Sequence, residues 1–411
     1  MFRVGQEEID AFTRVVNSGE LFRIGSKNQE VDNFEKELAE KISVDYALFV
    51  TGGTTALIAC LVGMGVGPGD EVIVPAYTFM ASALAITAVG AIPVIVDVDE
   101  TLMIDPKEIE KNISPHTKVI MPVHMLGYPC DMDSIMEIAE RHNVYVLEDA
   151  CQAVGGSYKG RRLGSIGKAG AFSFNYFKII SCGEGGAVLT NDRIVFERAV
   201  YLHDGGSTFR KDYVQLARDR QGGSYEEHED FPIYERFITP VFAGIQARQS
   251  EINGAIMRVQ LQRLDGILED LRKVKRQIMD GVSGVSGLKF LKSNDPEGDC
   301  STHLGFIFEN EELARKFAIG KGVNGALPID SGRHVYTNWD PIMNKRGAGH
   351  PDMNPFNMPA NEGLKHNYSP DMCRRTLDLL SRTVNVPLNP DWTQETIQHK
   401  IDSIKEAARN L

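Results

Sequence analysis

A single lysine stands in an apolar stretch that could carry covalent chemistry, AFSFNYFKIISCGEGGAVLTND at residues 171–192. Lys178 follows the strand-like FSF, and its neighbours are aromatic or aliphatic: Tyr176, Phe177, Ile179 and Ile180. A lysine amine withdrawn from water favours its neutral form, which is the nucleophile that condenses with a carbonyl to a Schiff base. The alternative is a lysine whose stem is buried and whose amine reaches solvent.

A glycine-rich turn, TGGTTAL, lies between a strand-like and a helix-like segment and contains Gly53, Thr54 and Thr55. Backbone N–H groups at a helix N-terminus suit a phosphate, and the threonine hydroxyls add donors. An ordinary strand-to-helix turn capped by threonine would look the same. The turn lacks the GxGxxG spacing of a dinucleotide site, which argues against a nicotinamide-dependent dehydrogenase.

Two further segments place polar or aromatic groups after strand-like runs. LEDACQA ends such a run with Glu148 and Asp149, and Gln152 follows one helical turn later. A buried carboxylate there needs a cationic partner, such as a protonated pyridine nitrogen, an arginine or a helix N-terminus. PAYTFMAS places Tyr77 and Phe79 where an aromatic side chain could stack on a planar ring or simply pack in the core.

These residues need a scaffold, and residues 46–191 predict one by alternating short apolar strands with helices. Because parallel sheets bind ligands at the carboxyl ends of their strands, the loops after residues 50, 75, 124, 149 and 175 should face one site. The expected strands are 46–50, 71–75, 92–98, 118–124, 144–149, 169–175 and 186–191. The expected helices are 7–18, 29–42, 54–64, a segment after Tyr77, 106–113 and 132–143.

The rest of the chain predicts a second, smaller unit. We expect a large α/β domain at 1–245, with a polar surface insertion at 206–243, and a bridging helix plus a small α+β domain at 246–411. The bridging helix should cover 248–280, and residues 343–370 should form a long loop. In the small domain we expect strands in LKFLKS, HLGFIFEN and VNVPL and helices at 311–320, 371–381 and 393–410.

Each motif is weak alone, but together they form a set. A phosphate cradle, a stacking aromatic, a carboxylate for a pyridine nitrogen and a lysine follow one another along one predicted sheet. This is the group of side chains that pyridoxal 5′-phosphate (PLP) requires.

The same motifs resemble the DegT/DnrJ/EryC1/StrS aminotransferases, which are sugar-modifying PLP enzymes of fold type I. The resemblance covers about residues 25–192 and includes GGTTAL, EDACQAVGGSYKG, FSFNYFK and GEGGAVLTND. It implies a Schiff-base lysine at Lys178, a pyridinium partner at Asp149 and a residue near the ring hydroxyl at Gln152. It also implies a stacking aromatic at Phe79 and a phosphate cradle made by Gly53, Thr54, Thr55 and Ser173.

The resemblance also implies a homodimer with shared active sites. Many relatives carry a GxNxR motif whose asparagine reaches the neighbouring subunit's phosphate, and here that position is Gln246, followed by Arg248. The stretch EDACQAVGGSYKG and residues 294–299 most resemble the 8-amino-3,8-dideoxy-octulosonate aminotransferase branch.

By this resemblance the chain is expected to move an amino group from L-glutamate or glutamine to a keto-sugar or nucleotide-linked keto-sugar. The pathway would build aminosugars, surface polysaccharides or antibiotic sugars. Family members that dehydrate sugars have histidine in place of the lysine, so Lys178 favours transamination. Dehydration, oxidation and a non-catalytic regulatory role remain as alternatives. Candidate substrate residues are His124, His203, Arg248, His334, Tyr336 and Trp339.

Composition limits the partners and the setting. The 411 residues carry a net charge of −12, which disfavours nucleic acid because phosphate binding needs a basic field. The six cysteines are scattered without a CxxC pair, which argues against a metal site or disulfide framework and favours a reduced, cytoplasmic setting. No apolar run is long enough to span a membrane.

Overall fold

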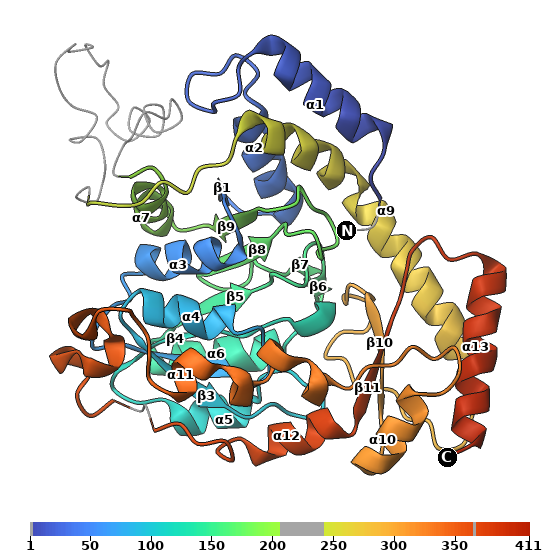
Figure 1. Cartoon of the computed structure of the whole chain (residues 1–411). Coiled ribbons are helices and arrows are strands. Elements are labelled where there is room, and N and C mark those ends of the chain that lie inside the picture. Colours follow the sequence, from blue (N-terminus) through green and yellow to red (C-terminus); the bar gives the residue numbers. More distant parts are fainter. Residues whose placement is uncertain (1–2, 206–241, 365–366) are drawn as a thin grey trace, which may run out of the picture.

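The computed structural model describes residues 3–205, 242–364 and 367–411 (Figure 1). A seven-stranded sheet forms its centre, in the order β1-β9-β8-β5-β4-β2-β3. Neighbouring strands from β3 to β8 are parallel, while β9 runs antiparallel to both β8 and β1. This confirms the predicted α/β fold with a mostly parallel sheet. The strands are β1 Tyr46–Val50, β2 Glu71–Pro75, β3 Ile92–Val96, β4 Thr117–Ile120, β5 Tyr145–Asp149, β8 Ala169–Ser173 and β9 Gly186–Thr190.

The sheet is covered on both faces, which explains why its strands are almost continuously apolar. Alternate residues of one strand point to opposite faces, so Ile73 belongs to one hydrophobic core and Val72 to the other. One face packs α3 Gly53–Gly63, α4 Ala81–Ala88 and α7 Arg193–His203. The other face packs α2 Glu30–Ile42, α5 Pro106–Asn112, α6 Met132–His142 and α9 Glu251–Gly281.

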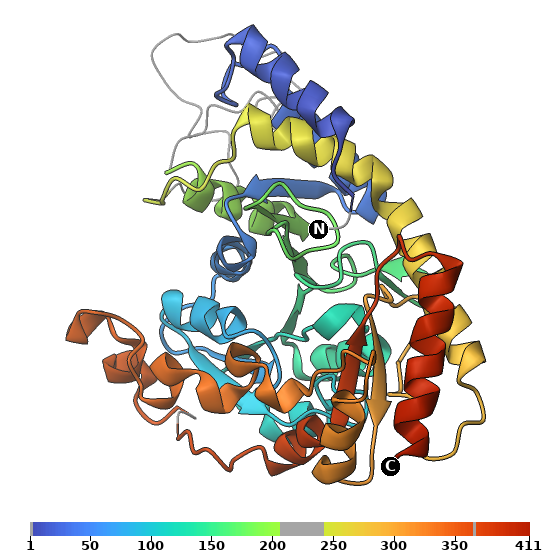
Figure 2. The ribbon, with the colours of Figure 1, turned by 45° about the vertical axis from the view of Figure 1, so that its right-hand side comes forward.

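Helix α9 joins the sheet to the C-terminal part of the chain. Its first half packs against α1 Gln6–Ser18 and α2, and its second half packs against α13 Gln394–Arg409 (Figures 1 and 2). The C-terminal part holds a two-stranded antiparallel sheet of β10 His303–Ile307 and β11 Thr383–Pro387, with helices α10 Glu311–Ala318 and α12 Arg374–Ser381. The boundary between the two predicted domains, at residue 245, stays a prediction.

Three sequence expectations need correction. LKFLKS is not a strand, because only Phe290 forms an isolated bridge, to Phe306. Strand β4 ends at Ile120 rather than 124, just before Pro122, which has no N–H for the sheet. The described part of 343–370 is not irregular: it contains the 3₁₀ turns Pro351–Met353, Pro355–Asn357 and Pro359–Asn361, each begun by a proline.

The remaining short elements connect these parts. They are the hairpin β6 Ser157–Tyr158 and β7 Arg161–Arg162, helix α11 Asp340–Met343, and the 3₁₀ turns η1 Met125–Gly127, η3 Pro328–Asp330, η4 Gly332–His334 and η5 Tyr336–Asn338. The predicted insertion at 206–243 lies almost wholly outside the described residues.

Candidate active site

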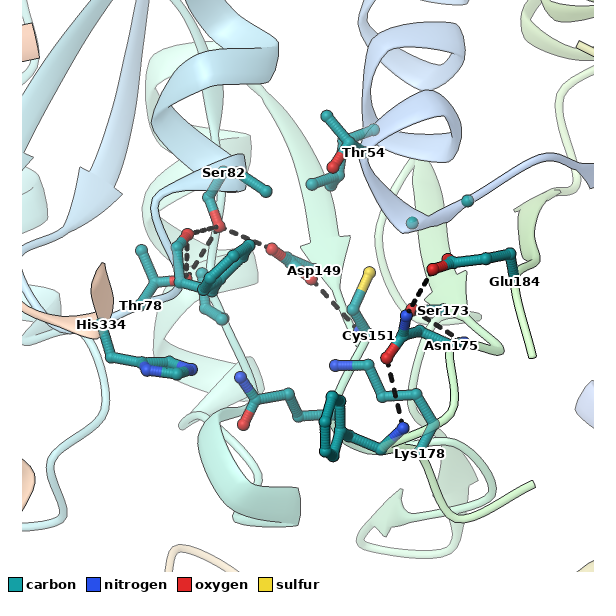
Figure 3. A pocket seen from close by; sticks show the side chains of 18 residues that line it. Thr54, Thr78, Ser82, Asp149, Cys151, Ser173, Asn175, Lys178, Glu184 and His334 are labelled. Carbon is teal, nitrogen blue, oxygen red and sulfur yellow. Dashed lines mark hydrogen bonds between the residues drawn. The ribbon is translucent and has the colours of Figure 1, made fainter. Parts of the chain in front are cut away.

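A cavity of about 520 Å³ opens at the carboxyl ends of the parallel strands (Figure 3). Its walls come from the segments that follow β1, β2, β5 and β8, so the prediction that these strand ends meet at one site is confirmed. The loop after β4 contributes only Val123. The lining includes Gly52, Gly53, Thr54, Thr78, Phe79, Ser82, Asp149, Cys151, Gln152, Ser173, Asn175, Phe177, Lys178, Glu184 and His334.

The turn before α3 can hold a phosphate because its glycines leave the backbone N–H groups uncovered and let the turn lie close to the sheet. Gly52 caps α3 without a side-chain bond, so N–H groups of the first turn are left for a ligand. A Cβ on Gly186 of β9 would lie 2.4 Å from the carbonyl oxygen of Gly52, and one on Gly53 would lie 2.8 Å from Cβ of Ser173. Thr54 and Ser173 line the cavity, whereas the hydroxyl of Thr55 pairs with that of Thr51 at 3.1 Å.

The two adjacent carboxylates at the end of β5 point in opposite directions. Asp149 lines the cavity, where its Oδ2 accepts a hydrogen bond of 2.7 Å from the hydroxyl of Ser82 and its Oδ1 accepts one of 3.2 Å from N–H of Cys151 (Figure 3). The hydroxyls of Ser82 and Thr78 are 2.8 Å apart. The sequence motif PAYTFMAS contained Ser82, but nothing in its spacing indicated a bond to Asp149.

Glu148 instead points into the protein behind the site. Its carboxylate accepts hydrogen bonds from N–H of Gly164, Ile166 and Gly167 at 2.6 to 2.8 Å. His124 lies 3.2 Å from the same carboxylate through Nε2, while its Nδ1 accepts from N–H of Cys130. The ring is fully buried, so the expected substrate role of His124 is replaced by a structural one: its Nε2–H donates a hydrogen bond to the buried carboxylate of Glu148.

Lys178 lies on the rim that the cavity shares with an adjoining one. Its surroundings are less apolar than expected, because Phe177 is 84% exposed and Tyr176 is 57% exposed, while Ile179 and Ile180 are buried. Polar neighbours that the sequence did not indicate are Asn175 and Glu184: the Asn175 amide donates to the Glu184 carboxylate at 3.0 Å.

Phe79 and His334 form the opposite wall. Phe79 is 39% exposed, and its ring centroid is 5.3 Å from that of His334. Backbone bonds place His334 there, since Thr78 N–H donates to the His334 carbonyl and Tyr336 N–H donates to the Ala76 carbonyl, both at 3.0 Å. Burial lowers the pKa of His334, which favours a neutral ring.

The other expected substrate residues do not line this cavity. Tyr336 is buried, and its hydroxyl donates to the carbonyl of Pro370 at 2.5 Å. Trp339 is also buried and donates from its indole N–H to the carbonyl of Arg333. Burial and these bonds leave neither polar group free for a substrate.

The segment around Gln246 lies beside the end of α7. Gln246 forms a backbone bridge with Asp204, and His203 is buried next to that aspartate. Arg248 extends over the ring of Phe22, 5.3 Å from its centroid, with a guanidinium nitrogen 3.5 Å from the carboxylate of Asp204. Within one described chain, these residues line neither this cavity nor the adjoining one.

The residues in the cavity fit PLP. The bare N-terminus of α3 and Ser173 would hold the phosphate, Phe79 would lie against the ring, and Asp149 would face the ring nitrogen. The Asp149 carboxylate accepts hydrogen bonds from the hydroxyl of Ser82 and from N–H of Cys151, and two carboxylate oxygens have further lone pairs for a protonated nitrogen. Gln152 lines the same cavity and is oriented by accepting from N–H of Leu126 at 3.1 Å.

Fold and cavity therefore define a PLP-dependent aminotransferase of fold type I. The sequence profile of the DegT/DnrJ/EryC1/StrS aminotransferase family matches residues 3–323, and the chain belongs to this family.

Known proteins support this assignment. The chain is 37% identical over 296 residues to dTDP-3-amino-3,4,6-trideoxy-alpha-D-glucose transaminase of Streptomyces venezuelae, covering 72% of this chain and 70% of the relative. It is 30% identical to the spore coat polysaccharide biosynthesis protein SpsC of Bacillus subtilis, over 99% of this chain and 95% of the relative. An aminotransferase structure from Psychrobacter cryohalolentis superposes with a TM-score of 0.78 at 26% identity, covering 99% of this chain and 98% of that one.

None of the described helices is long and apolar enough to cross a membrane. Among residues 3–205, 242–364 and 367–411, no group of three His, Cys, Asp or Glu side chains could hold a metal ion.

Proposed function

We propose that this aminotransferase moves the amino group of L-glutamate, or of glutamine, to the carbonyl of a nucleotide-linked keto-sugar. The observation that carries the proposal is the convergence of Lys178, Asp149 and the glycine turn on one cavity. Relatives named for amino-sugar products support the substrate class. They include the dTDP-linked transaminase of Streptomyces venezuelae and GDP-perosamine synthase of Caulobacter vibrioides, which is 42% identical over 59% of each chain.

The side chains have distinct tasks. Bound PLP supplies an electron sink for the carbon that loses its proton. The Nζ of Lys178 is the base that takes this proton and returns it, since Lys178 is the only lysine among the described residues that line the cavity. The carboxylate of Asp149 would keep the ring nitrogen of bound PLP protonated, and the hydroxyl of Ser82 holds that carboxylate in place. Phe79 lines the cavity and would cover one face of the bound ring.

We further propose that the enzyme is a homodimer. The strongly exposed Phe177 beside Lys178 leaves the rim open to solvent in one chain. Gln246 and Arg248 lie outside the cavity of their own chain. In a dimer, they could instead line the active site of the second chain. A cytoplasmic location and the octulosonate branch also stay predictions. All six cysteines are free, as is usual for proteins of the reducing cytoplasm.

The first experiment follows the visible absorbance of the purified protein. We expect a yellow protein whose absorbance band falls on addition of L-glutamate and returns on addition of 2-oxoglutarate. A yellow protein that responds only to glutamine would change the donor, and one that responds to neither would contradict transamination. In the Lys178→Ala variant, the cycle of amine-dependent loss and 2-oxoglutarate-dependent return of the band should be absent with either amine.

The second experiment identifies the acceptor. The amine-loaded enzyme is mixed with keto-sugars, beginning with GDP-4-keto-6-deoxymannose, and the return of the absorbance band reports transfer of nitrogen. If no nucleotide-linked keto-sugar restores the band while 2-oxoglutarate does, the proposed acceptor class is wrong.

A further inference from the structure

A second cavity of about 330 Å³ adjoins the first at Lys178. The two share Cys151, Gln152, Phe177, Lys178 and His334. The far wall of the second cavity comes from the C-terminal part of the chain: Thr302 and His303 at the start of β10, and Pro387 and Leu388 at the end of β11. A substrate that reaches Lys178 through this cavity would contact His303.

Hydrogen bonds settle which nitrogen of His303 carries the proton. The hydroxyl of Thr302 donates to the carbonyl of Leu126 at 2.7 Å, so its single proton is already used. The same hydroxyl oxygen lies 3.0 Å from Nδ1 of His303. Because it can only accept there, Nδ1 carries the proton and Nε2 presents a lone pair. Among the described residues, no protein group bonds to Nε2.

The ring is also neutral at physiological pH. Burial, with the nearby ammonium of Lys275, lowers the pKa of His303 to about 4. Lys275 stays charged in this position because its Nζ lies 2.6 Å from the carboxylate of Asp299. The main chain of His303 is fixed as well, since its carbonyl accepts from the hydroxyl of Tyr128 at 3.1 Å.

We propose that His303 determines specificity for the sugar substrate, with Nε2 accepting a hydrogen bond from a sugar hydroxyl. The inference rests on the proposed function and names one contact within it. A lone pair on Nε2 attracts a hydroxyl proton and repels a carboxylate oxygen, so the contact favours the sugar over the carboxylates of glutamate. Thr302 is the positioning residue that holds the ring in this tautomer.

Nitrogen NMR of histidine-labelled holoenzyme tests the tautomer without any substrate. The resonances of His303 are those missing from the His303→Gln variant. We expect a protonated Nδ1 and an unprotonated Nε2 at pH 7, and loss of this pattern in Thr302→Val but not in Thr302→Ser. A protonated Nε2 in the wild-type enzyme would overturn the proposal.

Half-reactions then test the contact. In His303→Leu, we expect the concentration of GDP-4-keto-6-deoxymannose, or of the accepted keto-sugar, needed for half-maximal rate to rise about tenfold or more, the cost of one lost hydrogen bond. His303→Gln keeps an acceptor atom and should recover most of this loss. The rate with L-glutamate should change less than about twofold in both variants.

The outcomes separate the two proposals. Equal losses with glutamate and sugar would assign His303 a merely structural role and overturn the inference. Failure of every keto-sugar with the wild-type enzyme would contradict the proposed acceptor, while the NMR result would still decide whether Nε2 is available as an acceptor.

Discussion

At the scale of single residues, neighbours in sequence do different work because a strand points them to opposite sides. Asp149 faces the cavity and Ser82, while Glu148 faces three backbone N–H groups and His124. Each carboxylate is thus buried with donors, as a buried charge requires. The site carboxylate is therefore the one that retains an open direction toward a ligand.

Replacing Asp149 by asparagine tests this division. We expect turnover to fall by on the order of 100-fold or more, because an amide cannot stabilise a positive charge on the facing nitrogen. Cofactor should remain bound after gel filtration, since the phosphate turn and Lys178 are untouched. Ser82→Ala is the control, and it should lose less than about tenfold because it removes one hydrogen bond to the carboxylate. Equal losses in the two variants would contradict the assignment.

The lowered pKa of His303 predicts a pH effect on stability. An unfolded histidine takes up a proton near pH 6.5, but folded His303 does so only near 4, so its contribution to stability falls as pH drops from 6.5 to 4. Between pH 7 and 4.5 the wild-type enzyme should lose roughly 2 kcal/mol more unfolding free energy than His303→Gln. Denaturant titrations of the two holoenzymes measure this difference. Parallel losses would show that His303 titrates normally in the folded state.

At the scale of elements, the site depends on how closely the turn before α3 approaches the sheet. Gly186 of β9 allows this approach because it has no Cβ. Antiparallel backbone hydrogen bonds between residues 76–80 and 333–336 likewise bring His334 to the cavity wall.

Gly186→Ala should therefore weaken cofactor binding. Its Cβ would lie within 2.4 Å of Gly52, which must push the phosphate turn away from the sheet. We expect the dissociation constant for PLP, measured by absorbance titration, to rise about tenfold or more.

The matched control is Gly266→Ala on α9, where a Cβ would meet nothing within 4 Å. This change should leave PLP affinity unaltered and raise the unfolding free energy by about 0.5–1 kcal/mol through helix propensity. Similar PLP affinities for both variants would show that the turn tolerates displacement.

At the scale of the whole molecule, the proposed dimer can be tested by pairing two chains that each carry a different inactivating substitution. Lys178→Ala and Gln246→Ala chains are co-expressed with different tags, and mixed dimers are isolated. If Gln246 completes the partner's site, each mixed dimer has one intact site and about half the wild-type activity per dimer. Activity no higher than that of either variant alone would place both residues in one chain's site.

A mixed dimer of Lys178→Ala with Asp149→Asn chains is the control. Both residues line the cavity of a single chain, so every site in this dimer carries one lesion. We expect it to be almost inactive, and restored activity would contradict the assignment of these two residues to one chain.

The sequence predicted much of this protein because local patterns carried the information. Apolar runs separated by helices indicated a parallel sheet, and the ends of β1, β2, β5 and β8 do meet at one cavity. Lys178, Asp149, Gln152, Phe79 and Gly53 all line it, as the motifs implied. Such motifs are readable because each residue lies next to the strand that positions it.

Contacts between distant segments were decided only by the tertiary structure. Ser82 reaches Asp149 across 67 positions, and Thr302 reaches Leu126 across 176. Tyr336 and Trp339 are buried, and His124 is hydrogen-bonded to Glu148. The sequence could not show this, because burial and hydrogen-bond partners depend on what packs around a side chain. The sequence alone thus determined the fold class, the family and the residues that line the first cavity, while the packing of the C-terminal part against the sheet decided which groups line the second cavity.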